Sequence, residues 1–171
     1  MTYPHVTLGG LPIDLHAGAP QQSYNPEGGM TDTRLSSGQL VRMIHWQRET
    51  ITISGQGWMG AGLDALDYTQ PLELRCTAPK NATSPSNVIQ LPDTVAIRPD
   101  VPPWGHALVG RRWVPTPATL SGTAGVCVPV PGASTYRFSW MPVFIVLCRP
   151  PAEALDAGQG NASWSFTAQQ I

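Results

Sequence analysis

Proline and glycine recur through most of this chain, and they limit what it can fold into. The 171 residues include 18 Pro and 17 Gly, about a fifth of the sequence. Proline breaks helix interiors because it lacks a backbone N–H and its ring clashes with the preceding turn. Charged residues make up only 12% of the chain, which is too few for the surfaces of helical bundles. The sequence therefore predicts an all-β fold built from short strands.

The apolar content is high enough for a substantial core. Hydrophobic residues are 42% of the sequence, and six Trp, four Tyr and three Phe are spread along it. A chain of this length buries about 70% of its unfolded surface and usually forms one domain. We expect a single β-rich domain over residues 1–171, with a loop-rich insertion around residues 77–119. The expected fold is an antiparallel sandwich or barrel with long Pro/Gly-rich loops and one short helix.

Several stretches alternate apolar and polar residues, which is the pattern of a strand with one buried face. In "ETITISGQGW" the buried positions are Ile51 and Ile53, and in "STYRFSW" they are the aromatic residues at 136, 138 and 140. "PLELRC", "HALVGRRWV", "GVCVPV" and "ASWSFTAQQ" are typical of further strands. Gly9 and Gly10 supply the positive φ of a two-residue turn, and they predict a β-hairpin within "HVTLGGLPIDLH".

The stretches between these strands carry weaker signals. "LVRMIHW" places apolar residues on both faces and predicts a central strand. The region before it, rich in Gly, Pro, Ser, Asn and Gln, predicts short strands at 22–24 and 30–35. "AGLDALDY" has helical spacing and predicts the one short helix, which ends before Pro71. Residues 77–103 predict edge strands and ordered loops, and Pro142 predicts a bend, a bulge or an edge strand.

Gly55, Gly57 and Gly60 have the spacing Gly-x-Gly-x-x-Gly of a dinucleotide-binding fingerprint. That fingerprint needs a buried parallel strand leading into a long helix, whose N-terminus holds the pyrophosphate. Here the preceding strand is amphipathic, Trp58 crowds the turn, and Pro71 leaves room for a short helix only. We therefore favour glycines that end an antiparallel strand over a nucleotide site.

Other catalytic and metal-binding patterns are weak. Asp64 and Asp67 share one helical face, but nothing nearby splits their pKa values as a glycosidase requires, which favours a solvated face. The four histidines and three cysteines show no zinc-site spacing. Cys76, Cys127 and Cys148 lie beside apolar residues and are expected to be buried free thiols. We expect no enzymatic activity, no catalytic residues, no metal and no cofactor.

Charge and apolar run length bear on two further classes of partner. The net charge of −1 gives no positive field to attract a nucleic acid backbone. The longest apolar run, Val143–Cys148, is far too short to span a bilayer, and the first residues lack a basic leader segment. We expect a protein synthesised in a cytoplasm, without nucleic acid sequence recognition and without membrane insertion.

Tryptophans and arginines supply the candidate contact residues. Nine of the ten basic residues are Arg, whose planar guanidinium suits protein contacts. Trp104 follows three prolines in a segment that either presents a stiff loop to another subunit or packs on its own sheet, whereas Trp140 and Trp164 are expected in the core. The residues that we expect at an interface are Trp104, Arg111, Arg112, Trp58 and Tyr24.

Two stretches resemble small structural proteins from the distal tail or baseplate of long-tailed bacteriophages. The first is "RLSSGQLVRMIHWQRETITISGQGWMGAGLDALDYTQPLELRC", and the second is "YRFSWMPVFIVLC" followed by "SWSFTAQQI". The resemblance implies a β-rich virion subunit that forms a homo-oligomeric ring at the end of the tail tube. It implies contacts with the tail tube protein and with tail-tip or hub proteins, and it brings no catalytic residues. Exposed strand edges and low charge density suit such repeated contacts between copies.

Three alternatives stay open at the level of sequence. Within the same class the chain could be a tail terminator or a head-to-tail joining protein. From other classes, it could be a carbohydrate-binding β-sandwich that uses its tryptophans, or an oxidoreductase that uses the glycine triplet. The preferred hypothesis is a non-enzymatic component of the virion tail.

Overall fold

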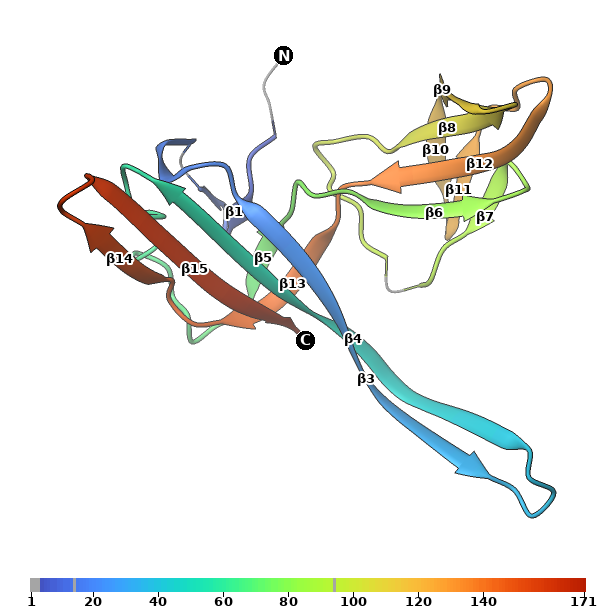
Figure 1. The fold of residues 1–171 in the computed structure, drawn as a ribbon, viewed down its shortest axis with the longest axis horizontal. Coiled ribbons are helices and arrows are strands. Elements are labelled where there is room, and N and C mark those ends of the chain that lie inside the picture. Colours follow the sequence, from blue (N-terminus) through green and yellow to red (C-terminus); the bar gives the residue numbers. More distant parts are fainter. Residues whose placement is uncertain (1–3, 14, 94) are drawn as a thin grey trace. The chain divides into compact units, whose positions relative to one another are not determined.

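The computed structural model describes residues 4–13, 15–93 and 95–171, and Figure 1 shows their arrangement into strands. The fold is all-β with antiparallel strand pairs, as the sequence predicts. By its internal contacts the chain divides into two compact units. Unit 1 comprises Arg75–Phe144 and the described residues up to Thr7, and unit 2 comprises Leu8–Leu74 and Ile145–Ile171. The region 77–119, which we expected to be an insertion, lies within unit 1.

Unit 1 is a sandwich of two antiparallel sheets. One sheet has the strand order β6-β12-β8-β9 and the other the order β10-β11-β7. The strands are β6 (Lys80–Ser84), β7 (Val88–Gln90), β8 (Trp104–Val109), β9 (Arg112–Thr116), β10 (Ala118–Ser121), β11 (Ala124–Cys127) and β12 (Ala133–Trp140). The expected edge strands of the 77–103 region are confirmed, since β6 and β7 each lie at the edge of a sheet.

The core of unit 1 follows from the period of two in β12. Tyr136, Phe138 and Trp140 are buried, and they pack with Ile89 and Cys127 from the second sheet in one apolar cluster. The two layers approach closely at Gly125 of β11, where a Cβ atom would lie 2.6 Å from the Phe138 ring. A glycine is needed there because any side chain would force the sheets apart. The inward-facing aromatic residues predicted for this stretch are confirmed.

Unit 2 carries most of an eight-stranded sheet, whose main path has the order β2-β1-β5-β13-β15-β4-β3, with β14 also paired to β15. The division between the units falls within β1, β5 and β13. Within the described part of the chain one 3-10 turn, η1, spans Leu15–Ala17. The strands are β1 (Thr7–Leu8), β2 (Leu11–Pro12), β3 (Gln21–Arg34), β4 (Leu40–Gly57), β5 (Leu72–Arg75), β13 (Val143–Cys148), β14 (Ala152–Asp156) and β15 (Asn161–Gln170).

One face of the β4–β15 pair forms the core of unit 2. Ile51 and Ile53 are fully buried on β4, and Trp164 and Phe166 are buried on β15, whereas the residues between them face outward. The Trp164 indole N–H donates a hydrogen bond of 2.7 Å to the carbonyl of Ala17, which places η1 over this face. The amphipathic strand predicted for "ETITISGQGW" and the core position predicted for Trp164 are confirmed.

The turn predicted at Gly9 and Gly10 is also confirmed. Gly9 and Gly10 have φ values of 56° and 84° and connect β1 to β2, which gives the predicted hairpin with strands of two residues each. Pro142 separates β12 of one sheet from β13 of another, and its carbonyl accepts a hydrogen bond from the Cys76 N–H. The chain therefore changes sheets at the proline, where a continuous ladder would lack a donor.

The predicted short helix at "AGLDALDY" is wrong, because residues 61–68 form turns, a bend and irregular backbone. Gly62 has a φ of +71°, which is left-handed backbone and ends any helix that begins there. Asp67 accepts hydrogen bonds from the N–H and hydroxyl of Thr69, so its side chain closes a local turn in place of a helical one. Leu63, which is one of the apolar residues at helical spacing, is 1% exposed because it is buried from an irregular segment and not from a helix.

The glycine triplet belongs to an antiparallel strand and the turn after it, as expected. A Cβ on Gly55 would lie 2.4 Å from the Trp164 ring, and a Cβ on Gly57 would lie 2.1 Å from the carbonyl oxygen of His16. At Gly60 the obstacle is the carboxylate of Glu153, at 2.5 Å. Each glycine thus permits a close approach between segments of unit 2, and no helix follows the motif within residues 58–70.

Candidate oligomerisation surface

Strands β3 and β4 continue far beyond the sheet that they belong to. Strand β15 pairs with β4 only from Thr50 to Gly57, so residues 26–49 have no third strand beside them. We call residues 26–49 the arm. Figure 1 shows it as a two-stranded ribbon that projects from the other strands of unit 2. An isolated two-stranded hairpin is at best marginally stable in water, which makes the arm the segment most in need of a partner.

The prediction of a central strand for "LVRMIHW" is wrong, because this stretch lies in the arm. No residue between 26 and 49 is buried. Apolar residues on both faces of a strand are typical of a sheet that other parts of the same chain cover on both sides. Burial between chains produces the same pattern, because an interface also covers both faces of a ribbon. The two predicted short strands at 22–24 and 30–35 are parts of one strand, β3, which β4 supports along its whole length.

The arm exposes an unusual number of large apolar side chains. Met30 and Ile44 lie opposite each other on one face and are 49% and 60% exposed. Leu40 on the same face is 52% exposed, and Met43 on the other face is 46% exposed. Single exposed apolar residues are ordinary, but several on one free ribbon indicate an interaction site or an aggregation hazard. On the first face the Asp32–Arg42 pair lies between the Met30–Ile44 pair and Leu40.

A bulge divides the arm into a proximal and a distal part. The register shifts between Gly29 and Met30, which pair with Trp46 and Ile44 and leave His45 unmatched. The Trp46 ring covers Gly29, because a Cβ there would lie 2.6 Å from the indole nitrogen. Trp46 remains 50% exposed. Bulges of this kind bend and twist a ribbon, and here the ring stabilises a strand that glycine weakens.

The charges of the arm balance one another. Arg42 forms a two-pronged ion pair with Asp32 on the neighbouring strand, with N–O distances of 2.7 and 2.8 Å. This hydrogen bond lowers the pKa of the Asp32 carboxyl and raises the pKa of the Arg42 guanidinium. The remaining arm charges also cancel, because the arm has three acidic residues and three arginines in all: Glu27, Asp32 and Glu49, and Arg34, Arg42 and Arg48. A net charge of zero suits an uncharged protein surface better than a polyanion.

The tip of the arm is a short closed turn. The Leu35 N–H donates to the Gln39 carbonyl at 2.9 Å, and the Gly38 N–H donates to the Leu35 carbonyl at 2.8 Å. Gly38 has a φ of +81°, which the turn requires and other residues rarely adopt. Leu35 is 49% exposed at this turn, so the apolar surface of the arm continues to its end.

The five residues that we expected at an interface occupy different kinds of position. Trp58 is 64% exposed, directly after β4, and its ring lies 5.2 Å from the His16 ring. Tyr24 is half-buried on β3 just below the arm. Arg111 and Arg112 are exposed in the turn and first residue of β9. Trp104 is the half-buried first residue of β8 and pairs with Ser139, so it is part of a sheet and not of a protruding loop.

The residues that sequence reasoning misses are the apolar side chains of the arm. Met30, Leu40, Met43, Ile44 and Trp46 fall in stretches that predict ordinary strands. The available signal is the absence of alternation in "LVRMIHW" next to a segment with poor strand propensity. A central strand needs partners on both sides, and the preceding Gly- and Pro-rich segment could supply only one.

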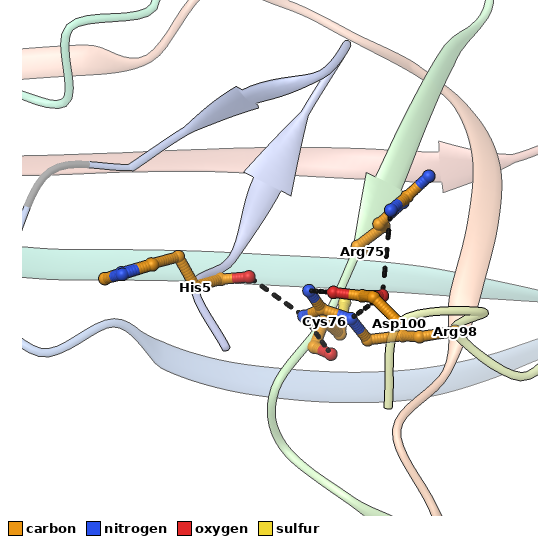
Figure 2. Close-up of polar contacts among 5 residues, drawn as sticks. All are labelled: His5, Arg75, Cys76, Arg98 and Asp100. Carbon is orange, nitrogen blue, oxygen red and sulfur yellow. Dashed lines mark hydrogen bonds and ion pairs between the residues drawn. The ribbon is translucent and has the colours of Figure 1, made fainter. Parts of the chain in front are cut away.

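Arg98 is the only buried charged side chain among the described residues, and Figure 2 shows the polar cluster that it forms in unit 1. Arg98 is 3% exposed and pairs with both oxygens of Asp100, at 3.0 and 2.7 Å. It also donates to the carbonyls of His5 and Cys76, at 2.9 and 3.2 Å. Arg98 lowers the pKa of the Asp100 carboxyl. Its donors are engaged by the chain itself, so Arg98 ties three segments of unit 1 together and leaves little for a ligand.

The other candidates from the sequence do not combine into a site. In the part of the chain that the structure describes, no three His, Cys, Asp or Glu side chains gather as metal ligands would. Cys76 and Cys127 are buried free thiols as predicted, and Cys148 is half-buried. Burial raises the pKa of the Cys127 and Cys148 thiols, which makes them poor nucleophiles. Asp64 is exposed, and so is Asp67.

Comparison with protein-family models finds no matching family, and comparison with curated protein sequences finds no matching protein. Among the described residues there is also no helix with the length and apolar character needed to cross a bilayer. The arm is therefore the feature from which a function can be argued.

Proposed function

We propose that this chain is a structural subunit of a bacteriophage tail tip or baseplate, where it forms a homo-oligomeric ring that joins the tail tube to tail-tip components. The observation that carries the proposal is the arm, a ribbon with apolar side chains on both faces and no third strand beside it. The resemblance of two sequence stretches to distal tail and baseplate proteins supplies the biological setting.

A building block needs surfaces that remain incomplete until copies meet. Leu40, Met43 and Ile44 are about half exposed. This exposure is unfavourable in a free subunit, and burial of the three side chains at an interface would favour assembly. An extended ribbon that binds a different surface on the next copy makes a heterologous contact, and repetition of that contact closes a ring when the rotation allows. The low charge of the chain suits permanent interfaces, whose centres are depleted of charged residues.

The partners in this proposal are further copies of the chain, the tail tube protein and tail-tip or hub proteins, and the location is the virion tail. A catalytic role, a cofactor and a metal have no part in the proposal. A tail terminator or head-to-tail joining protein is the alternative within the same class, because it would use the same kind of ring at the other end of the tail.

Image averaging of the purified protein by electron microscopy tests the proposal. We expect closed rings with a central channel, and antibodies against the chain should label the distal end of tails in particles that contain it. Labelling at the head-proximal end would favour the tail terminator or joining protein. Dispersed single subunits at every concentration would contradict the ring.

A further inference from the structure

The outer face of unit 2 has a composition that a solvent-facing sheet does not need. On β4 this face consists of Thr50, Thr52, Ser54 and Gln56, and on β15 of Ser163, Ser165, Thr167 and Gln169. None of these eight positions carries a charge, and most side chains are short. The Thr52 and Thr167 hydroxyls lie 3.4 Å apart across the strands. Exposed sheet faces usually carry charged residues, which keep them from associating.

The outer face is hollowed along much of its width. One open groove of about 670 Å³ runs over β3, β4, β15 and β14, between Gln21 and Ala152. A second groove of about 570 Å³ runs from Leu147 of β13 over Thr167. Both grooves are lined by Ala152 and Ser165, so they lie next to each other on this face, and we call the two grooves together the trough. The trough lies entirely within unit 2.

The β13 side of the trough is apolar. Leu147 pairs with Gln169 and therefore points to the outer face, and Ile145 lies two residues before it on the same side of the strand. These side chains are 45% and 46% exposed. The outer face thus offers apolar anchors at one side and a floor of small hydroxyl and methyl groups, over which another β-layer can approach closely.

We propose that the arm of one copy lies in the trough of the next copy, with its Met30 and Ile44 side chains toward the trough. This inference rests on the proposed ring, which needs two different surfaces that fit each other. The arm supplies one surface and the trough the other, and each copy gives one arm and receives one. The contact is heterologous, so it repeats around a ring and does not stop at a dimer.

Charge and size identify a second copy as the occupant. The arm has no net charge, and its Asp32–Arg42 pair is satisfied internally, so it can cover the eight uncharged residues of β4 and β15 without leaving the charges of that pair unpaired. The charged residues that also line the grooves are Glu153 and Arg149. With about nine residues per strand, the arm is roughly 30 Å long and about 10 Å wide. Its footprint of about 300 Å² on each partner, about 600 Å² in total, is below the roughly 1,200 Å² of a stable pairwise interface. A single such contact would be weak, whereas a ring repeats it in every copy.

Substitutions on the two surfaces test the inference in the full-length chain. Ser165→Arg places a charge in the trough and should raise the concentration needed for half-assembly at least about tenfold. Ser165→Ala at the same position and Ser121→Arg on exposed β10 should assemble as the wild type does. Ile44→Glu should block the arm and raise the concentration needed for half-assembly by at least about tenfold as well.

Disulfide trapping gives a second readout that does not depend on a disruptive substitution. In a Cys148→Ser background, Ile44→Cys would be combined in turn with Ser163→Cys, Ser165→Cys and Thr167→Cys. Oxidation should produce a ladder of linked chains with at least one of the three, and none with Ser121→Cys as the control.

The outcomes separate the two proposals. Rings that persist in Ser165→Arg, together with no ladder from any of the three cysteine pairs, would overturn the arm-in-trough contact and leave the ring itself standing. A wild-type chain that never assembles would remove the ring, and the arm-in-trough contact with it.

Discussion

The pair Met30 and Ile44 offers a quantitative test of the arm. We consider the double substitution Met30→Ser, Ile44→Ser, which removes two apolar side chains that face each other across the strands. They are 49% and 60% exposed, so about half of each side chain is still available for burial by a partner. Complete burial of such a side chain contributes about 1.5–3 kcal/mol, and half of that for each of two residues is about 1.5–3 kcal/mol per interface. This corresponds to a loss of roughly 10- to 150-fold in interface affinity.

The same substitution should hardly affect the folded subunit. Cross-strand apolar pairs contribute about 0.2–1 kcal/mol, which for a chain of this size lowers Tm by about 2–4 °C at most. Sedimentation velocity over a concentration series measures assembly, and a thermal melt measures folding. Leu120→Ser on β10 is the matched control, because Leu120 is 42% exposed but lies outside the arm. Unchanged assembly of the double variant would refute the reasoning, and so would an assembly defect accompanied by a large fall in Tm.

Further predictions concern the two units separately. Arg98 lowers the pKa of Asp100, so the Asp100 carboxylate contributes its full stabilisation above the ordinary value of 3.8 and loses it as the pH falls through the lower folded-state pKa. Asp100→Asn should weaken this acid sensitivity in denaturant titrations. It should also destabilise the protein at pH 7 by about 2–3 kcal/mol, because Arg98 is left buried without its carboxylate. Gly55→Ala should lower the unfolding free energy by about 2–3 kcal/mol, since the new Cβ would lie 2.4 Å from the Trp164 ring; a change under about 0.5 kcal/mol would show that the ring moves freely. Cys127 is fully buried and its pKa is raised, so it should react with thiol reagents at pH 8 only after denaturation, and rapid labelling of the native protein at this position would contradict the packing of unit 1.

The sequence predicted most strands because burial inside one chain leaves a period of two. Tyr136, Phe138 and Trp140 alternate with polar neighbours, and the same holds for Ile51 and Ile53, and all of these are buried as expected. Their burial depends on the chain alone, so it can be inferred from the chain alone. The turn at Gly9 and Gly10 was predictable for a similar reason, because positive φ is a local requirement.

The arm could not be predicted because its apolar residues are not buried within the chain. The segment from Pro26 to Gly29 has poor strand propensity, and it is extended only because β4 pairs with it. The apolar residues of "LVRMIHW" suggest a central strand, although the pattern does not specify which molecule covers them. A short stretch of sequence does not show which distant strand it pairs with, or whether another copy of the chain covers it.

The failed helix prediction has a different origin. The apolar spacing in "AGLDALDY" fits one helical turn, but Gly62 adopts left-handed backbone and Asp67 binds Thr69 locally. Short polar side chains compete with helical hydrogen bonds whenever few turns are available to offset them. The trough was equally invisible in the sequence, since its small uncharged residues resemble those of any exposed strand until β4, β14 and β15 are placed side by side.

The most direct measurement of the central claim is the solution mass of the chain with and without its arm. The comparison requires the full-length protein and a variant in which residues 26–49 are replaced by a two-residue Asn-Gly turn between Asn25 and Thr50. Sedimentation equilibrium should give a ring of more than two copies of the 18.3 kDa chain for the full-length protein, and a folded monomer for the variant. A monomeric full-length protein, or rings formed equally well without the arm, would contradict the account.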